Sequence, residues 1–153
     1  SKLEKRNILA DWSFVFLGEG PLESKVITLI NQHALQHRIH VISTIHDMPP
    51  AYRNADLFIL PSLYEGMSNA LMEAAASSCP ILVSRGANEA GIINSERGWI
   101  AEDPLCDSLE TVLSLTEEER VLKGQKAAAY IMQNFSAKRV VEETVGVYRT
   151  TLN

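Results

Sequence analysis

The sequence predicts an α/β fold built on a doubly wound parallel sheet. Short apolar segments alternate with segments of helical periodicity from residue 13 onward, which is the pattern of strands joined by helical crossovers. The apolar runs at 13–17 and 56–61 suit strands that are buried on both faces. A chain of 153 residues with 46% hydrophobic residues is sufficient for one domain with a sizeable core.

Capping residues mark where several helices begin. Gly20 suits the cap of a helix that opens with proline, and Ser68 and Ser136 can cap two more. Thr116 and Glu119 have the spacing of a capping box. In chain order the predicted elements are a helix tail at 1–10, strand 13–17, helix 20–36, strand 39–43, helix 47–54, strand 57–60, helix 69–78, strand 81–84, a loop with a helical turn at 86–93, strand 98–101, and helices 105–115, 116–134 and 136–152.

Charge and cysteine content exclude several classes of protein. The net charge is −5 and no basic stripe occurs, which argues against nucleic acid or an anionic membrane surface as the main partner. Cys79 and Cys106 form no C-x-x-C pair and are expected to be buried, reduced thiols in a cytoplasmic protein. No apolar run approaches membrane-spanning length. The chain opens in mid-pattern at Ser1, which indicates a piece of a longer protein.

The strongest candidate for a functional site is the segment 61–80. It reads as a strand end, a loop and a helix capped by Ser68. Open α/β sheets bind ligands at the carboxyl ends of their strands, and a helix N-terminus offers amides and a positive dipole end to a phosphate. Glu65 precedes the helix, and Glu73 lies five residues past the cap, about 7 Å along the axis. An anion at the helix start would therefore have a carboxylate on either side.

Simpler interpretations stand beside these features. Two glutamates at this spacing also occur by chance on a solvated surface. Gly18 and Gly20 follow the first strand, where glycines allow either a tight turn or close approach of a ligand, and the third glycine of a dinucleotide fingerprint is absent. His33 and His37 stand four residues apart and are interpreted as surface histidines, so no metal site is predicted.

The residues around the two glutamates resemble a known motif. P-S-x-x-E-G, a second Glu after seven intervening residues, then A-x-A and a Pro resemble the E-x7-E donor-site motif of family-4 retaining glycosyltransferases, which have the GT-B fold. The resemblance covers nearly the whole chain as the Rossmann-like, C-terminal, donor-binding half. It implies a catalytic Glu65 that contacts the sugar. The donor-binding positions that it implies are Gly66, Met67 and Ser68 around the sugar, Asn69 and Ala70 at the diphosphate, Glu73 at the ribose, Ile45 and His46 at the base, and Gly18 and Gly20 near the cleft.

The resemblance also implies a reaction and its partners. The donor would be a nucleotide-diphosphate sugar, with a uridine diphosphate (UDP) sugar the commonest in the family, and no metal would be required. A hexose or N-acetylhexosamine would pass to a glycan, lipid-linked or polysaccharide acceptor, as in polysaccharide biosynthesis. The acceptor-binding N-terminal domain and the family's diphosphate-neutralising Arg and Lys are not found in this chain, so the chain alone is expected to be inactive. That missing domain could also place the cytoplasmic protein at the inner face of the membrane.

The sequence departs from the family pattern at two places, and two alternative functions stay open. Ser78 stands where the family usually has Gly, and the loop near Ile45 looks shortened. A non-catalytic nucleotide-binding or regulatory module would have the same sheet. A hydrolase using Glu65 and Glu73 as an acid–base pair would place sugar between the carboxylates, but it gives no reason for a helix start aimed between them.

Overall fold

The structure is a computed structural model that describes residues 12–151. The predicted helix tail at 1–10 lies outside the described residues. The chain divides into two compact units, Ser1–Met48 and Pro49–Asn153. Among the described residues, the first unit contains a two-stranded sheet and the second a three-stranded sheet, and every strand pair is parallel. This confirms the parallel pairing that the alternation of strands and helices predicts.

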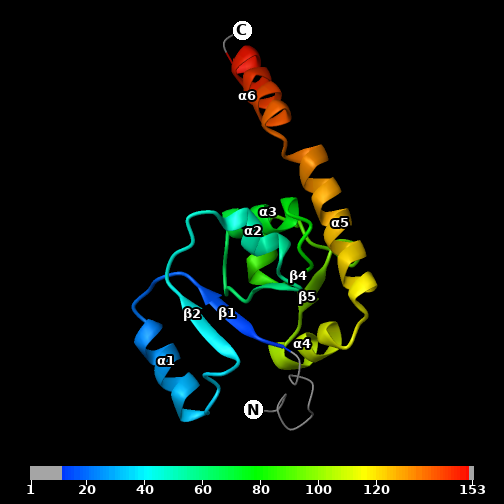
Figure 1. Ribbon diagram of the computed structural model, residues 1–153. Coiled ribbons are helices and arrows are strands. Elements are labelled where there is room, and N and C mark those ends of the chain that lie inside the picture. Colours follow the sequence, from blue (N-terminus) through cyan, green and yellow to red (C-terminus); the bar gives the residue numbers. More distant parts are fainter. Residues whose placement is uncertain (1–11, 152–153) are drawn as a thin grey trace. The chain divides into compact units, whose positions relative to one another are not determined.

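The first unit is a β-α-β arrangement. Strand β1 (Phe14–Leu17) pairs in parallel with β2 (Ile39–Ile42), and α1 (Glu23–Gln32) connects them (Figure 1). The predicted helix 20–36 is too long at both ends. The amide of Glu23 donates to the Gly20 carbonyl at 3.1 Å in a turn that precedes α1. Ala34 has φ 52°, a left-handed conformation that cannot continue a right-handed helix.

The second unit contains the sheet that positions the candidate site. Its strand order is β3-β4-β5, and both pairs are parallel. Most predicted elements are confirmed to within a few residues. In chain order the unit contains α2 (Met48–Arg53), which begins at the boundary between the units, β3 (Phe58–Leu60), α3 (Asn69–Ala76), β4 (Ile81–Ser84), the 3-10 turn η2 (Gly86–Asn88), β5 (Trp99–Ala101), α4 (Leu105–Leu113), α5 (Glu117–Asn134) and α6 (Ala137–Thr151).

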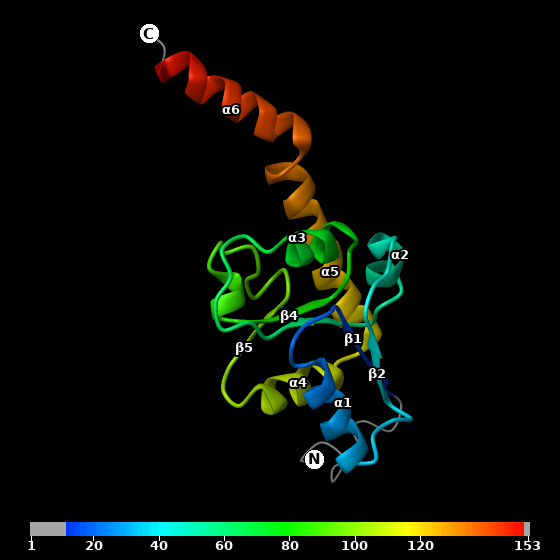
Figure 2. The ribbon, with the colours of Figure 1, turned by 90° about the vertical axis from the view of Figure 1, so that its left-hand side faces the viewer.

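Strand β4 is the centre of this unit's core. Ile81, Leu82 and Val83 are fully buried, as an uninterrupted apolar run in a central parallel strand predicts. Helices α3 and α4 lie on opposite sides of β4 (Figures 1 and 2), and α5 packs along α3. The sheet is therefore covered on both faces, which confirms the doubly wound arrangement.

Three expectations about burial change in the structure. The strand at 13–17 was expected to be buried on both faces, but most of β1 is exposed, with Val15 and Phe16 each 51% exposed. Its sheet has only two strands, so it offers little cover within its own unit. Cys79 is buried as predicted, but Cys106 is only half-buried on α4. The apolar stripe predicted on the last helix is exposed, because α6 buries none of its residues and extends away from the sheet of its unit (Figure 2). No helix in residues 12–151 is long and apolar enough to cross a membrane.

The turn after α3 has a backbone conformation at Ser78 that favours glycine. Ser78 has φ 61°, the left-handed conformation that commonly ends a helix and favours glycine. We expect Ser78→Gly to raise the free energy of unfolding by about 0.5–1 kcal/mol, because it removes a left-handed penalty of roughly 1–2 kcal/mol while adding unfolded-state entropy. Urea unfolding measures the change. The control is Ser77→Gly, at φ −85°; a Ser78→Gly variant no more stable than that control would contradict the explanation.

Candidate functional site

The start of α3 is formed as the sequence predicts. Ser68 has an extended backbone conformation, and its Oγ accepts a hydrogen bond from the Leu71 amide at 3.4 Å. Ser68 is buried, so its hydroxyl satisfies a donor that is shielded from water. The amides of Asn69 and Ala70 lie in the first turn, where no preceding turn supplies carbonyl partners. The binding of an anion by these two amides stays a prediction.

The loop before α3 holds Glu65 at two points. The Glu65 amide donates to the Gly86 carbonyl at 2.9 Å. Its carboxylate Oε1 accepts from the Ser62 hydroxyl, also at 2.9 Å. Ser84, at the end of β4, donates through its hydroxyl to the Ser62 carbonyl. Glu65 is half-buried and therefore fixed relative to the sheet, although it lies in a loop.

A buried tyrosine holds Glu73. The Tyr52 hydroxyl on α2 donates to Glu73 Oε2 at 3.4 Å. Tyr52 is 5% exposed, and its ring packs edge-on against Phe58 with centroids 5.6 Å apart. Tyr52 was not among the predicted site residues, because nothing in the sequence links a residue of the short second helix with the helix that carries Glu73. The structure thus brings α2 to the carboxylate proposed for the ribose.

Two buried side chains of this unit, the Tyr52 hydroxyl and the Cys79 thiol, have raised pKa values. Burial, with a smaller effect of the Glu73 carboxylate, raises the pKa of Tyr52 from 10.0 to about 12. Burial also raises the pKa of the Cys79 thiol from 9.0 to about 12, and its Sγ lies 3.6 Å from the Ala55 carbonyl oxygen. Both groups remain neutral in the folded chain under conditions where the unfolded chain would ionise them.

This proton retention predicts a loss of stability at alkaline pH. The unfolded chain binds fewer protons than the folded chain above about pH 9 for Cys79 and pH 10 for Tyr52, so the free energy of unfolding falls as pH rises toward 12. Urea unfolding across this range measures the slope. Tyr52→Phe should flatten the upper part of the curve and Cys79→Ala the lower part. Variants with the slope of the parent chain would contradict the assignment.

The predicted site residues of the first unit lie in two linked loops. Gly18, after β1, has φ 129°, a conformation that side chains disfavour. The Thr44 hydroxyl donates to the Glu19 carboxylate at 2.9 Å, so the loops that follow β1 and β2 are joined. Ile45 is half-buried and His46 is exposed in the second of these loops. The convergence of Gly18, Gly20, Ile45 and His46 with the α3 residues stays a prediction, because the structure establishes each unit by itself.

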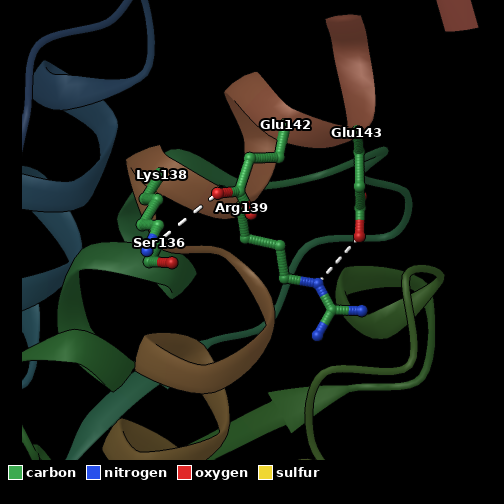
Figure 3. A pocket seen from close by; sticks show the side chains of 5 residues that line it. All are labelled: Ser136, Lys138, Arg139, Glu142 and Glu143. Carbon is green, nitrogen blue, oxygen red and sulfur yellow. Dashed lines mark hydrogen bonds and ion pairs between the residues drawn. The ribbon is translucent and has the colours of Figure 1, made fainter. Parts of the chain in front are cut away.

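The second unit has a hollow of about 430 Å³ that is separate from the predicted site. Figure 3 shows its lining at the start of α6, where Arg139 pairs with Glu143 at 2.8 Å and Lys138 with Glu142 at 4.0 Å. Within each of these exposed pairs the two residues are one helical turn apart, and such pairs stabilise their own helix modestly. None of the predicted donor-binding residues lines this hollow.

The histidines and acidic residues do not assemble into a metal centre in the part of the chain that is described. Residues 12–151 contain no group of three or more His, Cys, Asp or Glu side chains placed to hold an ion. His33 and His37 are both exposed.

The sequence of this chain is similar to a known protein family and to individual proteins. Residues 1–117 match the family described as glycosyl transferases group 1. A UDP-Gal:alpha-D-GlcNAc-diphosphoundecaprenol alpha-1,3-galactosyltransferase from Escherichia coli is 26% identical over 148 residues, covering 94% of this chain and 38% of that protein. The chain therefore spans well under half the length of this relative.

Solved structures show the same fold. The C-terminal domain of a glycosyl transferase group 1 family protein (LpcC) from Francisella tularensis superposes with a TM-score of 0.74 at 23% identity, covering 86% of this chain and 76% of that one. A mutant of TarM from S. aureus, crystallised with UDP and other ligands, superposes with a TM-score of 0.83 at 20% identity, covering 95% of this chain and 30% of that one. At these identities the likeness establishes the fold.

Proposed function

Because this chain belongs to the glycosyl transferases group 1 family, we propose that it is the donor-binding half of a retaining glycosyltransferase that uses a nucleotide-diphosphate sugar. One observation carries the proposal: the Ser68-capped start of α3 follows a loop that holds Glu65, and α3 itself carries Glu73, which Tyr52 holds. A nucleotide-diphosphate sugar has its diphosphate between two groups that carry hydroxyls, the ribose and the sugar. Its binding site therefore needs one anion-binding element between two hydrogen-bond acceptors.

Each part of the donor has a chemically suitable partner. The amides of Asn69 and Ala70 bind the diphosphate at the positive end of the helix dipole. The Glu73 carboxylate accepts from the ribose hydroxyls, and Glu65 accepts from the sugar hydroxyls. The remaining residues of the predicted donor site have backbone roles: Gly66, Met67 and Ser68 line the sugar, Gly18 and Gly20 border the cleft, and Ile45 and His46 meet the base.

UDP is the donor nucleotide that the comparisons favour. The name of the E. coli relative specifies a UDP-sugar, and the TarM crystal contained UDP. The diphosphoundecaprenol in the name of the E. coli relative supports a lipid-linked glycan acceptor for the whole protein. The acceptor would be bound by a second domain, with catalysis in the cleft between the two. On this proposal the 153-residue chain alone does not transfer sugar.

The ribose assignment is tested by Glu73→Gln. Loss of the charged acceptor should weaken UDP binding by about 1.5–3 kcal/mol, the range for a hydrogen bond to a charged group. Isothermal titration calorimetry on the full-length protein measures it. The matched control is Glu117→Gln, at an exposed carboxylate in the first turn of α5. UDP affinity that is equal in Glu73→Gln and the control would remove Glu73 from the site.

A further inference from the structure

We propose that Ser62 and Ser84 are positioning residues that hold the Glu65 carboxylate in place for the donor sugar. The proposal rests on the proposed function, since it concerns the carboxylate assigned to the sugar. It adds two residues whose hydroxyls do not contact the substrate. They act through Glu65: Ser62 follows β3 by two residues, and Ser84 is the last residue of β4.

Hydrogen bonds tie the two strand ends together in both directions. From the β4 side, the Ala87 amide donates to Ser84 Oγ at 3.2 Å, and the Ser84 hydroxyl donates to the Ser62 carbonyl. In the opposite direction, the Glu65 amide donates to the Gly86 carbonyl at 2.9 Å. The residues 62–65 are thereby fixed to the turn 84–87, and this interlocked pair is called the strap below.

A glycine makes the close approach within the strap possible. A Cβ on Gly86 would lie 1.9 Å from the Leu63 carbonyl oxygen and 3.2 Å from the Tyr64 amide nitrogen. Both are backbone atoms that cannot rotate away. The loop that carries Glu65 therefore lies directly on the backbone at Gly86, and the position of one determines the position of the other.

The β4 side of the strap is anchored in the core. Asn88 donates through its side-chain amide to the Ile93 carbonyl at 2.8 Å and accepts from the Ile93 amide at 2.9 Å. Ile93 is 2% exposed, and Ala87 is also buried. The turn after β4 thus rests on packed residues, so the loop with Glu65 has a rigid support although it is on the surface.

One more hydrogen bond orients the Glu65 carboxylate itself. The Ser62 hydroxyl donates to Glu65 Oε1 at 2.9 Å, and among the described residues it is the group that bonds to this carboxylate. Oε1 is held by the protein, and Oε2 is left to accept from a sugar hydroxyl. A glutamate side chain loses substantial rotamer freedom when ordered, and here this ordering precedes binding. The donor sugar then meets an acceptor that is already oriented.

The direct test is Ser62→Ala in the full-length enzyme, with a UDP-sugar donor and an acceptor on which the parent enzyme turns over. We expect kcat to fall roughly 10- to 100-fold, because a misplacement of about 1 Å can cost on the order of 100-fold. The dissociation constant of UDP should change less than about threefold, because Ser62 is proposed to act on the carboxylate that meets the sugar and not on the nucleotide. Ser62→Thr, which keeps the hydroxyl, should restore most of kcat. The matched control Ser114→Ala removes an exposed hydroxyl that bonds to its own helix and should leave kcat unchanged.

A double variant separates positioning from a general loss of structure. If Ser62 acts through Glu65, adding Ser62→Ala to Glu65→Ala should lower kcat by less than about threefold more, since the two residues form one unit. Ser84→Ala should lower kcat in the same direction as Ser62→Ala, with Ser84→Thr restoring it. Full additivity of Ser62→Ala and Glu65→Ala, or failure of Ser62→Thr to restore kcat, would overturn the proposal.

The outcomes distinguish this proposal from the proposed function. If Ser62→Ala keeps the parent kcat while Glu65→Ala loses it, the positioning proposal is wrong and the proposed function stands. If Glu65→Ala itself keeps the parent kcat, the assignment of Glu65 to the donor sugar fails, and the positioning proposal is overturned with it.

Discussion

Glu65→Ala is expected to lower kcat of the full-length enzyme by at least about 100-fold, the scale seen when one oriented polar group is removed from an active site. Glu65 is held through its amide by Gly86 and through its carboxylate by Ser62, so the hydrogen bonds to the sugar that we propose for it would cost little reorganisation. UDP affinity should stay within about a factor of three, because the carboxylate is assigned to the sugar and not to the nucleotide.

Steady-state transfer kinetics and UDP titration, made on the same preparations, measure the two effects separately. The matched control is Glu89→Ala, an exposed carboxylate after η2. A Glu65→Ala enzyme with parent turnover would place the sugar elsewhere. A parallel loss of UDP affinity and turnover would instead move Glu65 to the nucleotide.

Gly124→Ala is expected to destabilise the chain by about 3 kcal/mol, the upper end of the usual range for overpacking. A Cβ at Gly124 would lie 2.2 Å from the Ser78 carbonyl oxygen and 3.0 Å from the Cys79 carbonyl carbon. Alanine would gain about 1 kcal/mol in helix propensity, but the contact is with backbone at the α3–β4 turn and cannot relax cheaply. The packing of α5 on α3 therefore requires glycine at this position.

The chain offers a control for this substitution in a second helical glycine. A Cβ on Gly146 in α6 would meet no atom within 4 Å. Gly146→Ala should therefore show the propensity effect alone and stabilise by roughly 0.5–1 kcal/mol. Urea unfolding of both variants measures the difference. The two substitutions are expected to change stability in opposite directions, and a Gly124→Ala chain as stable as the parent would mean that α5 does not lie where the structure has it.

Local signals were sufficient for much of the fold and part of the site. The Ser68 cap depends on neighbouring residues alone, and the side chain of Ser68 accepts the expected type of bond. The capping box of Thr116 and Glu119 is also confirmed, with both reciprocal bonds present. The strand predicted at 81–84 is confirmed with the same bounds. Family membership was correctly inferred from the residues around Glu65 and Glu73.

The rest depends on contacts between distant residues. Tyr52 and Glu73 are 21 positions apart, and Ser84 and Ser62 are 22 apart, so no local pattern marks either pair. The end of α1 was missed because alanine seldom adopts the left-handed conformation that Ala34 has. Cys106 lies on a face of α4 that is only half covered, and composition alone could not distinguish it from Cys79.

A crystal structure of the full-length protein with an intact UDP-sugar tests the proposed donor site most directly. We expect the diphosphate at the amides of Asn69 and Ala70, the ribose hydroxyls within hydrogen-bonding distance of Glu73, and the sugar against Glu65 Oε2 with Ser62 still bonded to Oε1. A donor bound away from the start of α3, or one whose ribose and sugar exchange these two carboxylates, would contradict the proposed donor site.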